Sequence, residues 1–236
     1  MPVTKHLLVI NVIVWLATFV FEQTGVVDLY QWLGLHFWLG SDFNPAQFFT
    51  YMFMHGGFGH LFVNMFSLWM FGSLIEKVLG SKRYLFYYIS CGLGAALVQE
   101  LVWQFSWQDM LAGRVTGPVS SVQDIINAVN AGHADFTMDD FYNRMVTVGA
   151  SGAVFGLLLA FAMIFPNMPM YIIPFPFPIK AKWMVLGYGV LELFFGVSHT
   201  MSGVAHYAHL GGMIAGIIMI LYWKHNGTLS RGNGFY

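Results

Sequence analysis

Charged side chains are scarce in this sequence. Only 9% of its 236 residues are Asp, Glu, Lys or Arg, whereas 57% are hydrophobic. A water-soluble domain carries about 25% charged residues, which it needs to cover its surface. The composition therefore excludes an ordinary soluble protein and predicts one whose solvent is mostly lipid.

The sequence also lacks a second cysteine and a signal-peptide cleavage site. Cys91 is the only cysteine, so an intramolecular disulfide is excluded. The first apolar run, Leu7 to Phe21, lacks a small-residue cleavage site and is followed by bulky aromatic residues. We therefore expect this run to be a retained membrane span rather than a signal peptide.

Long apolar runs are abundant. Several approach the roughly 20 residues that a helix needs to cross a bilayer. They predict an all-α polytopic bundle of six transmembrane helices, forming a single membrane domain over residues 1–236. The predicted spans are 5–21, 59–78, 84–103, 146–165, 181–197 and 203–223, with long loops at 22–58 and 104–145. In the second loop, capping-box patterns begin at Ser121 and at Thr137 and predict two short helices.

The basic residues indicate an orientation. With the N-terminus in the cytoplasm, eight of the ten Lys and Arg residues lie on the cytoplasmic side, and only Arg114 and Arg144 lie outside. Seven aspartates lie on the outer side: Asp28, Asp42, Asp109, Asp124, Asp135, Asp139 and Asp140. The positive-inside rule then predicts that both termini are cytoplasmic.

Polar side chains occur inside the predicted spans, where they are costly and often functional. Ser151 is about five residues into the fourth span and His209 about six into the sixth, which puts them roughly 7–9 Å below the outer ends. Asn64 is at a similar depth in the second span, with His60 one turn above it. We therefore expect these groups to lie at one level in the membrane.

Small residues predict that the fourth and sixth spans pack closely. Gly152 and Gly156 form a small-xxx-small pair, as do Gly212 and Gly216. Such pairs let two membrane helices approach each other closely. A hydrogen bond between Ser151 and His209 would then be within reach.

These residue types fit nucleophilic catalysis. A serine hydroxyl becomes a useful nucleophile when a neutral imidazole takes its proton. His60 and Asn64 lie four residues apart on one helix face and can both donate to an oxyanion. Ser151 lies near a helix N-terminus, where unpaired backbone N–H groups favour negative charge.

At these positions the sequence resembles the rhomboid family of intramembrane serine proteases. The matching motifs are Gly149-Ala-Ser151-Gly152, the pattern of His55, His60 and Asn64, and Ala208-His209-Leu-Gly211-Gly212. The resemblance extends from about Asn44 to the end of the sixth span.

The resemblance implies a catalytic dyad of Ser151 and His209 without an acidic third member. It also implies an oxyanion hole formed by His60, Asn64 and the backbone N–H of Ser151, with Gly149, Gly152, Phe155 and Gly212 in supporting positions. Phe155 replaces a tyrosine of some relatives and can stack on His209. The fifth span, loosened by Gly187-Tyr-Gly189, would be a lateral gate.

Substrates implied by the resemblance are single-span membrane proteins, cut near the extracytoplasmic end of their helix. The resemblance further implies a multi-pass protein of a bacterial inner membrane, whose site opens to the extracytoplasmic side. We expect no cofactor. We also expect no metal, because no carboxylate or cysteine is predicted to converge on His60 and His209. The sequence contains no basic patch of the kind that would indicate nucleic acid as a partner.

Several alternatives remain open at this point. His206 is one turn before His209 and is the rival base, whereas His55 is more typical of a structural histidine. Glu192 could contact a partner in the gate or reach the lipid headgroups. The whole chain could instead be a rhomboid-like protein that binds membrane clients without cutting them, or a small-solute transporter or channel. A transporter would place its polar groups at mid-membrane rather than near one face.

Overall fold

The computed structural model describes residues 1–112, 121–171, 177–198 and 205–229. Within these ranges, five helical segments are long and apolar enough to cross a membrane, and a sixth apolar helix is shorter. The prediction of an all-α polytopic membrane protein is thus confirmed, apart from two pairs of two-residue strands. The predicted start of the last span at 203, together with Arg114 and Arg231 of the charge pattern, lies outside the described residues.

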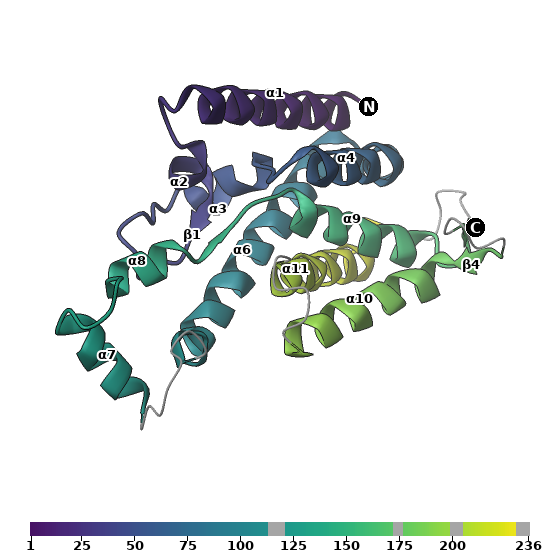
Figure 1. Cartoon of the computed structure of the whole chain (residues 1–236). Helices are drawn as coiled ribbons and strands as arrows, with labels where there is room; N and C mark the ends of the chain where they lie inside the picture. The colour runs from purple at the N-terminus through teal and green to yellow at the C-terminus, as the bar shows by residue number, and fades with distance from the viewer. Residues whose placement is uncertain (113–120, 172–176, 199–204, 230–236) are drawn as a thin grey trace.

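The elements follow in chain order (Figure 1). They are α1 (Pro2–Thr24), α2 (Leu29–Leu33), β1 (Leu35–His36), α3 (Gln47–Thr50), the 3₁₀ helix η1 (Tyr51–Phe53), α4 (Phe58–Ser67), the π-helical turn η2 (Leu68–Gly72), α5 (Ser73–Leu79), α6 (Ser81–Ala112), α7 (Val122–Asn130), α8 (Met138–Asn143), β2 (Val146–Thr147), α9 (Ser151–Ile164), β3 (Pro169–Met170), β4 (Ile179–Lys180), α10 (Ala181–Ser198) and α11 (His206–His225). The segments α4, η2 and α5 form one continuous helical span.

Helix α11 is the central element of the bundle. Its most extensive contacts are with α6 and α9, and α10 packs against it as well. Figure 1 shows α11 between these three helices, while α1 and α4 lie together on another side. Histidines near the start of α11 are therefore surrounded by protein rather than by lipid.

Glycines allow α9 and α11 to touch along their backbones. A Cβ atom on Gly212 would fall on the carbonyl group of Gly152. A Cβ atom on Gly156 would meet the sulfur of Cys91 and lie 3.1 Å from the carbonyl oxygen of Gly212. The close packing that the two small-xxx-small pairs predict is present.

Glu76 joins the start of α1 to the start of α6. Its carboxylate accepts hydrogen bonds from the backbone N–H groups of Val3 and Thr4, at 3.1 and 2.9 Å. It also accepts from the hydroxyls of Thr4 and Ser81, both at 2.7 Å. Helix N-termini carry unpaired N–H groups and partial positive charge, so a buried carboxylate stabilises this end of α1.

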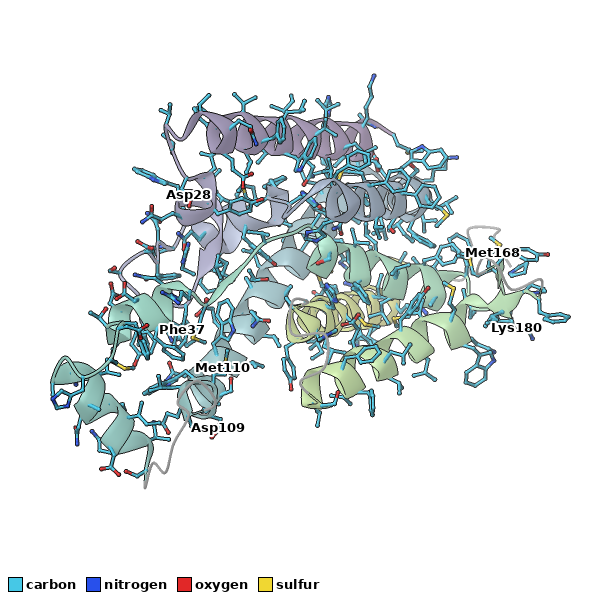
Figure 2. The ribbon with its side chains drawn as sticks, in the orientation of Figure 1. Asp28, Phe37, Asp109, Met110, Met168 and Lys180 are labelled. Atoms are coloured by element: carbon cyan, nitrogen blue, oxygen red, sulfur yellow. The ribbon has the colours of Figure 1, made fainter. Side chains whose placement is uncertain are left out.

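The two long loops fold against each other. Strand β1 pairs antiparallel with β2, with Leu35 opposite Thr147. Phe37 is fully buried in a second apolar cluster with Trp103 and Phe141, and Figure 2 shows it between α8 and the end of α6. We call residues 35–43 together with α7 and α8 the loop module.

Both short helices predicted in the second loop are present. The Ser121 hydroxyl accepts the backbone N–H of Asp124 at 3.2 Å and caps α7. Thr137 and Asp140 form a complete capping box at the start of α8. Local side-chain chemistry was therefore sufficient to locate these helices.

Two helices differ in length from the predicted spans. The third span was predicted to end at 103, and α6 continues to Ala112, where its last turns pack Leu111 into the loop module. The fourth was predicted to begin at 146, and α9 begins at Ser151 because β2 is held extended by β1. With 14 residues, α9 is about 21 Å long, which is shorter than the roughly 30 Å hydrocarbon core.

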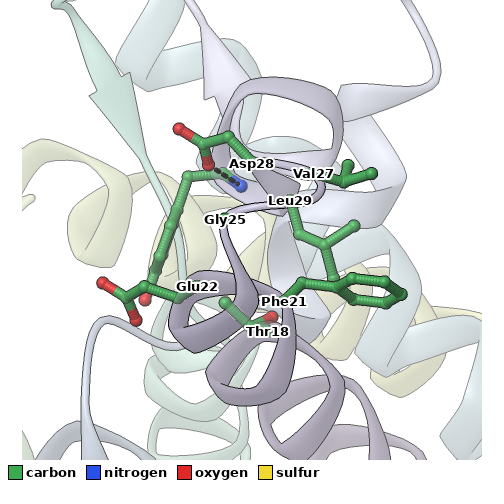
Figure 3. A pocket seen from close by; sticks show the side chains of 8 residues that line it. Thr18, Phe21, Glu22, Gly25, Val27, Asp28 and Leu29 are labelled. Carbon is green, nitrogen blue, oxygen red and sulfur yellow. Dashed lines mark hydrogen bonds between the residues drawn. The ribbon is translucent and has the colours of Figure 1, made fainter.

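A small hollow of about 230 Å³ lies where α1 turns into α2 (Figure 3). Asp28 at its rim accepts the backbone N–H of Tyr30 at 2.8 Å and caps α2. Partial burial, together with the nearby carboxylates of Glu22 and Asp28, raises the pKa of Tyr30. The Asp28 carboxylate therefore has a structural role as the N-cap of α2.

Candidate active site

A cavity of about 750 Å³ lies among the membrane helices. Its lining includes Ser151 from α9, His209 from α11, His60 and Asn64 from α4, and Glu192 from α10. Residues far apart in the sequence thus line one space, as the sequence predicted for four of them. Ser151 is the first residue of its helix rather than the sixth of a helical span, and the depth of these groups in a membrane stays a prediction.

A sharp turn presents Ser151 to the cavity. Gly149 has a φ of 133°, in a region that L residues rarely adopt. Its backbone N–H donates to the carbonyl of Tyr51 at 3.0 Å, which anchors the turn to η1. The chain then enters α9, so Ser151 stands where the helix leaves its first N–H groups unpaired.

His209 lies in the first turn of α11, and its ring reaches Ser151. The distance between His209 Nε2 and Ser151 Oγ is 2.8 Å. Phe155, one turn after Ser151, stacks on the imidazole with ring centroids 4.2 Å apart and planes 7° apart. The predicted stacking is confirmed, and it fixes the plane in which the ring nitrogens lie.

His206 does not reach Ser151 but contacts Glu192. The distance between His206 Nδ1 and Glu192 Oε2 is 2.7 Å, and the same oxygen lies 3.0 Å from His209 Nδ1. The expectation that no carboxylate converges on His60 and His209 is therefore wrong for His209. The sequence showed a carboxylate in an apolar span, but it left Glu192 open between a gate contact and the headgroups, because the partner histidines are on another helix.

Glu192, His206 and His209 offer nitrogen and oxygen atoms that all lie within 4.8 Å of one another. That spacing would admit a divalent cation. However, one carboxylate oxygen already lies at bonding distance from both rings, and zinc sites usually need a fourth ligand or a water. We assign no metal to this cluster.

His60 is oriented to donate into the cavity. The backbone N–H of Gly56 donates to His60 Nδ1 at 3.3 Å, which leaves the ring proton on Nε2. A Cβ atom on Gly149 would lie 2.9 Å from that Nε2 and 3.5 Å from Ser151 Oγ, so the three groups are neighbours. Asn64 Nδ2 donates to the His60 carbonyl at 3.0 Å and has a second N–H to offer.

His55 supports His60 from outside the span. The two rings meet edge to face with centroids 5.1 Å apart. Burial lowers the pKa of His55 to about 3, and the neighbouring His60 lowers it further in the same direction. A neutral, buried ring in this place is consistent with the structural role expected of His55.

Residues 43–225 match the rhomboid domain, which is most of the chain. This protein belongs to the rhomboid family. The match contains Ser151, His209, His60, Asn64 and Glu192.

Curated relatives of this rhomboid-family chain come from several kinds of organism. It is 27% identical over 235 residues to the chloroplastic rhomboid-like protein 11 of Arabidopsis thaliana, covering 91% of this chain and 62% of that protein. It is 27% identical to the mitochondrial rhomboid protein 1 of Saccharomyces cerevisiae, covering 70% and 38% of the two chains. It is also 27% identical to the rhomboid protease AarA of Providencia stuartii, covering 72% and 53%. The chain thus spans between 38% and 62% of the length of these relatives.

Proposed function

We propose that this chain is an intramembrane serine endopeptidase that cuts single-span membrane proteins through a covalent acyl-enzyme. The observation that carries the proposal is the 2.8 Å contact between Ser151 Oγ and His209 Nε2 in a cavity among membrane helices. Membership of the rhomboid family and similarity to a relative named as a protease support it.

Each step uses a group that lines the cavity. Ser151 Oγ attacks the scissile carbonyl carbon while His209 Nε2 accepts its proton. His209 then returns that proton to the leaving amine, and a water molecule hydrolyses the acyl-enzyme by the same route. His60 Nε2–H, Asn64 and the backbone N–H of Ser151 are the donors for the oxyanion.

The charge pattern supports a proposal for orientation. Asp28 and Asp109 lie on the opposite side of the molecule from Lys180 in Figure 2. Under the positive-inside rule, the acidic side is extracytoplasmic and both termini are cytoplasmic. We therefore propose that the cavity opens to the extracytoplasmic side of a bacterial inner membrane and cuts substrate helices near that end.

Cleavage of a single-span reporter tests the proposal. We expect Ser151→Ala and His209→Ala each to lower the rate by at least about 10³-fold, because the two groups act as a unit. Ser106→Ala and His225→Ala are the matched controls, since neither residue lines the cavity, and both should keep wild-type activity. Mass spectrometry should map the cut near the extracytoplasmic end of the reporter helix.

A fluorophosphonate probe separates the protease from a binder of membrane clients. If the protein is a serine protease, the probe reacts with Ser151 and no labelling occurs in Ser151→Ala. If the wild-type protein neither cleaves reporters nor labels, the inactive binder is favoured. Solute flux in proteoliposomes that survives Ser151→Ala would favour a transporter instead.

A further inference from the structure

We propose that Glu192 is a positioning residue that acts through His209 and completes a Ser151–His209–Glu192 arrangement. This inference rests on the proposed protease function and goes beyond the dyad that the sequence resemblance implies. Glu192 would hold the imidazole so that Nε2 faces Ser151, and it would stabilise the imidazolium that forms when Ser151 loses its proton.

The geometry distinguishes the two nitrogens of His209. Nε2 faces Ser151 Oγ at 2.8 Å, and Nδ1, on the other side of the ring, lies 3.0 Å from Glu192 Oε2. A carboxylate can only accept, so it selects the tautomer with its proton on Nδ1. The lone pair of Nε2 is then free to take the serine proton, as a general base requires.

The Nδ1 contact is at ion-pair distance but lacks the alignment of a full hydrogen bond. In enzymes without bound substrate, catalytic hydrogen bonds are often poorly aligned and tighten when substrate binds. Phe155 stacks on the ring and fixes its plane, so we expect the carboxylate to be the group that moves when this hydrogen bond forms.

Burial indicates why the carboxylate must have these partners. The Glu192 side chain is only 15% exposed and lies in a helix whose other charged residue, Lys182, is ten positions away near the start. A charged group in such a place is costly unless it is paired. Among the described residues its ion-pair partners are His206 and His209, and no Lys or Arg forms an ion pair with it.

Charged and titratable groups approach His209 from four helices. They are Glu192 of α10, His206 of α11 itself, His60 of α4 and Ser151 of α9. Glu192 is the only acidic group among them. Removal of its charge should therefore leave a signature in the pH dependence that a purely structural contact would not produce.

The test compares Glu192→Gln with wild type in reporter cleavage over a range of pH. We expect kcat to fall by about 10²-fold, which is within the range for general acid–base assistance, while KM changes by less than about threefold. The carboxylate favours the imidazolium, so its loss should move the acidic limb of the kcat profile to lower pH. The rate of fluorophosphonate labelling of Ser151 should fall in parallel.

A structural alternative is that Glu192 merely fastens α10 to α11 through His206. That role predicts equal losses in Glu192→Gln and His206→Gln, with the acidic limb unmoved in both. We expect His206→Gln to lower kcat by less than Glu192→Gln and to keep the limb near its wild-type position. Glu22→Gln, which changes an exposed carboxylate on α1, should match wild type. Thermal unfolding in detergent checks that each variant is folded.

The outcomes separate this inference from the function on which it rests. An active, labelled wild type with an unchanged Glu192→Gln variant overturns the role of Glu192 alone. Equal effects of the Glu192 and His206 variants, without a shift in pH profile, also overturn it in favour of the fastening role. A wild type that neither cleaves nor labels overturns the protease proposal itself.

Discussion

Gly149 holds the turn that presents Ser151, and it does so under two constraints. Its φ of 133° is one that a residue with a Cβ atom rarely adopts. A Cβ atom there would also lie 2.9 Å from the His60 ring. A side chain at position 149 would therefore disturb both the turn that presents Ser151 and the neighbouring His60 ring.

We predict that Gly149→Ala lowers fluorophosphonate labelling of Ser151 by at least about tenfold, since strain of about 1–3 kcal/mol would be relieved by moving the turn. The matched control is Gly59→Ala in α4, where a Cβ atom would meet no atom within 4 Å. Wild-type labelling in Gly149→Ala would show that the turn does not need glycine.

At this scale the sequence predicted the cavity residues well but not all of their contacts. Ser151, His209, His60 and Asn64 line one cavity, as motif spacing suggested, although their catalytic roles stay predictions. The position of Glu192 could not be inferred because it depends on how α10 is rotated against α11. No local pattern in either helix fixes that rotation.

Helices α9 and α11 form the element pair on which the site depends. One carries Ser151 and the other His209, and their backbones touch where Gly212 faces Gly152. Lipid provides no hydrophobic drive between helices, so close van der Waals packing must hold this pair together. The distance between Ser151 and His209 therefore depends on the glycines at the contact between α9 and α11.

We predict that Gly212→Ala destabilises the protein by about 1–3 kcal/mol, as overpacking commonly does, and abolishes most reporter cleavage by separating the two helices. Thermal unfolding in detergent and the cleavage assay measure the two effects. Gly59→Ala in α4 is the control, because a Cβ atom there would meet no atom within 4 Å. If both variants had the same thermal stability and cleavage rate, close packing of α9 against α11 at Gly212 would not be needed for activity.

The sequence predicted which segments form helices, but it did not predict where α6 ends or where α9 begins. Long apolar runs and capping boxes depend on local sequence, and the structure confirms the helices that they predict. The start of α9 depends instead on the pairing of residues 146–147 with 35–36. Such a non-local contact leaves no mark in the sequence around Ser151.

Across the whole molecule, the loop module joins the first long loop to the second. Ser41 donates to Asp139 through its hydroxyl at 2.6 Å and its backbone N–H at 2.8 Å. These bonds favour the ionised form and lower the pKa of Asp139 below its usual 3.8. The apolar composition of the first loop did not predict this polar connection.

We predict that contact between Ser41 and Asp139 weakens as the pH falls below about 3.8. A carboxylate with a lowered folded-state pKa stabilises the fold above its unfolded value, and this contribution is lost as pH falls through the folded-state value. Hydrogen exchange of α8 should therefore rise more in wild type than in Asp139→Asn when the pH is lowered. Asp135→Asn, at an exposed position in the same loop, should behave like wild type. Identical pH responses in wild type and Asp139→Asn would contradict the prediction.

Cys91 has a practical consequence for studying this protein. It is the only thiol in the chain, it is fully buried, and it lies against Gly156 in the middle of the bundle. The natural sequence is thus already a background for site-specific attachment of spin labels or fluorophores. A cysteine placed at an exposed position of α10 and another on α11 would report the separation of these helices in a bilayer, with the native sulfur shielded from the reagent.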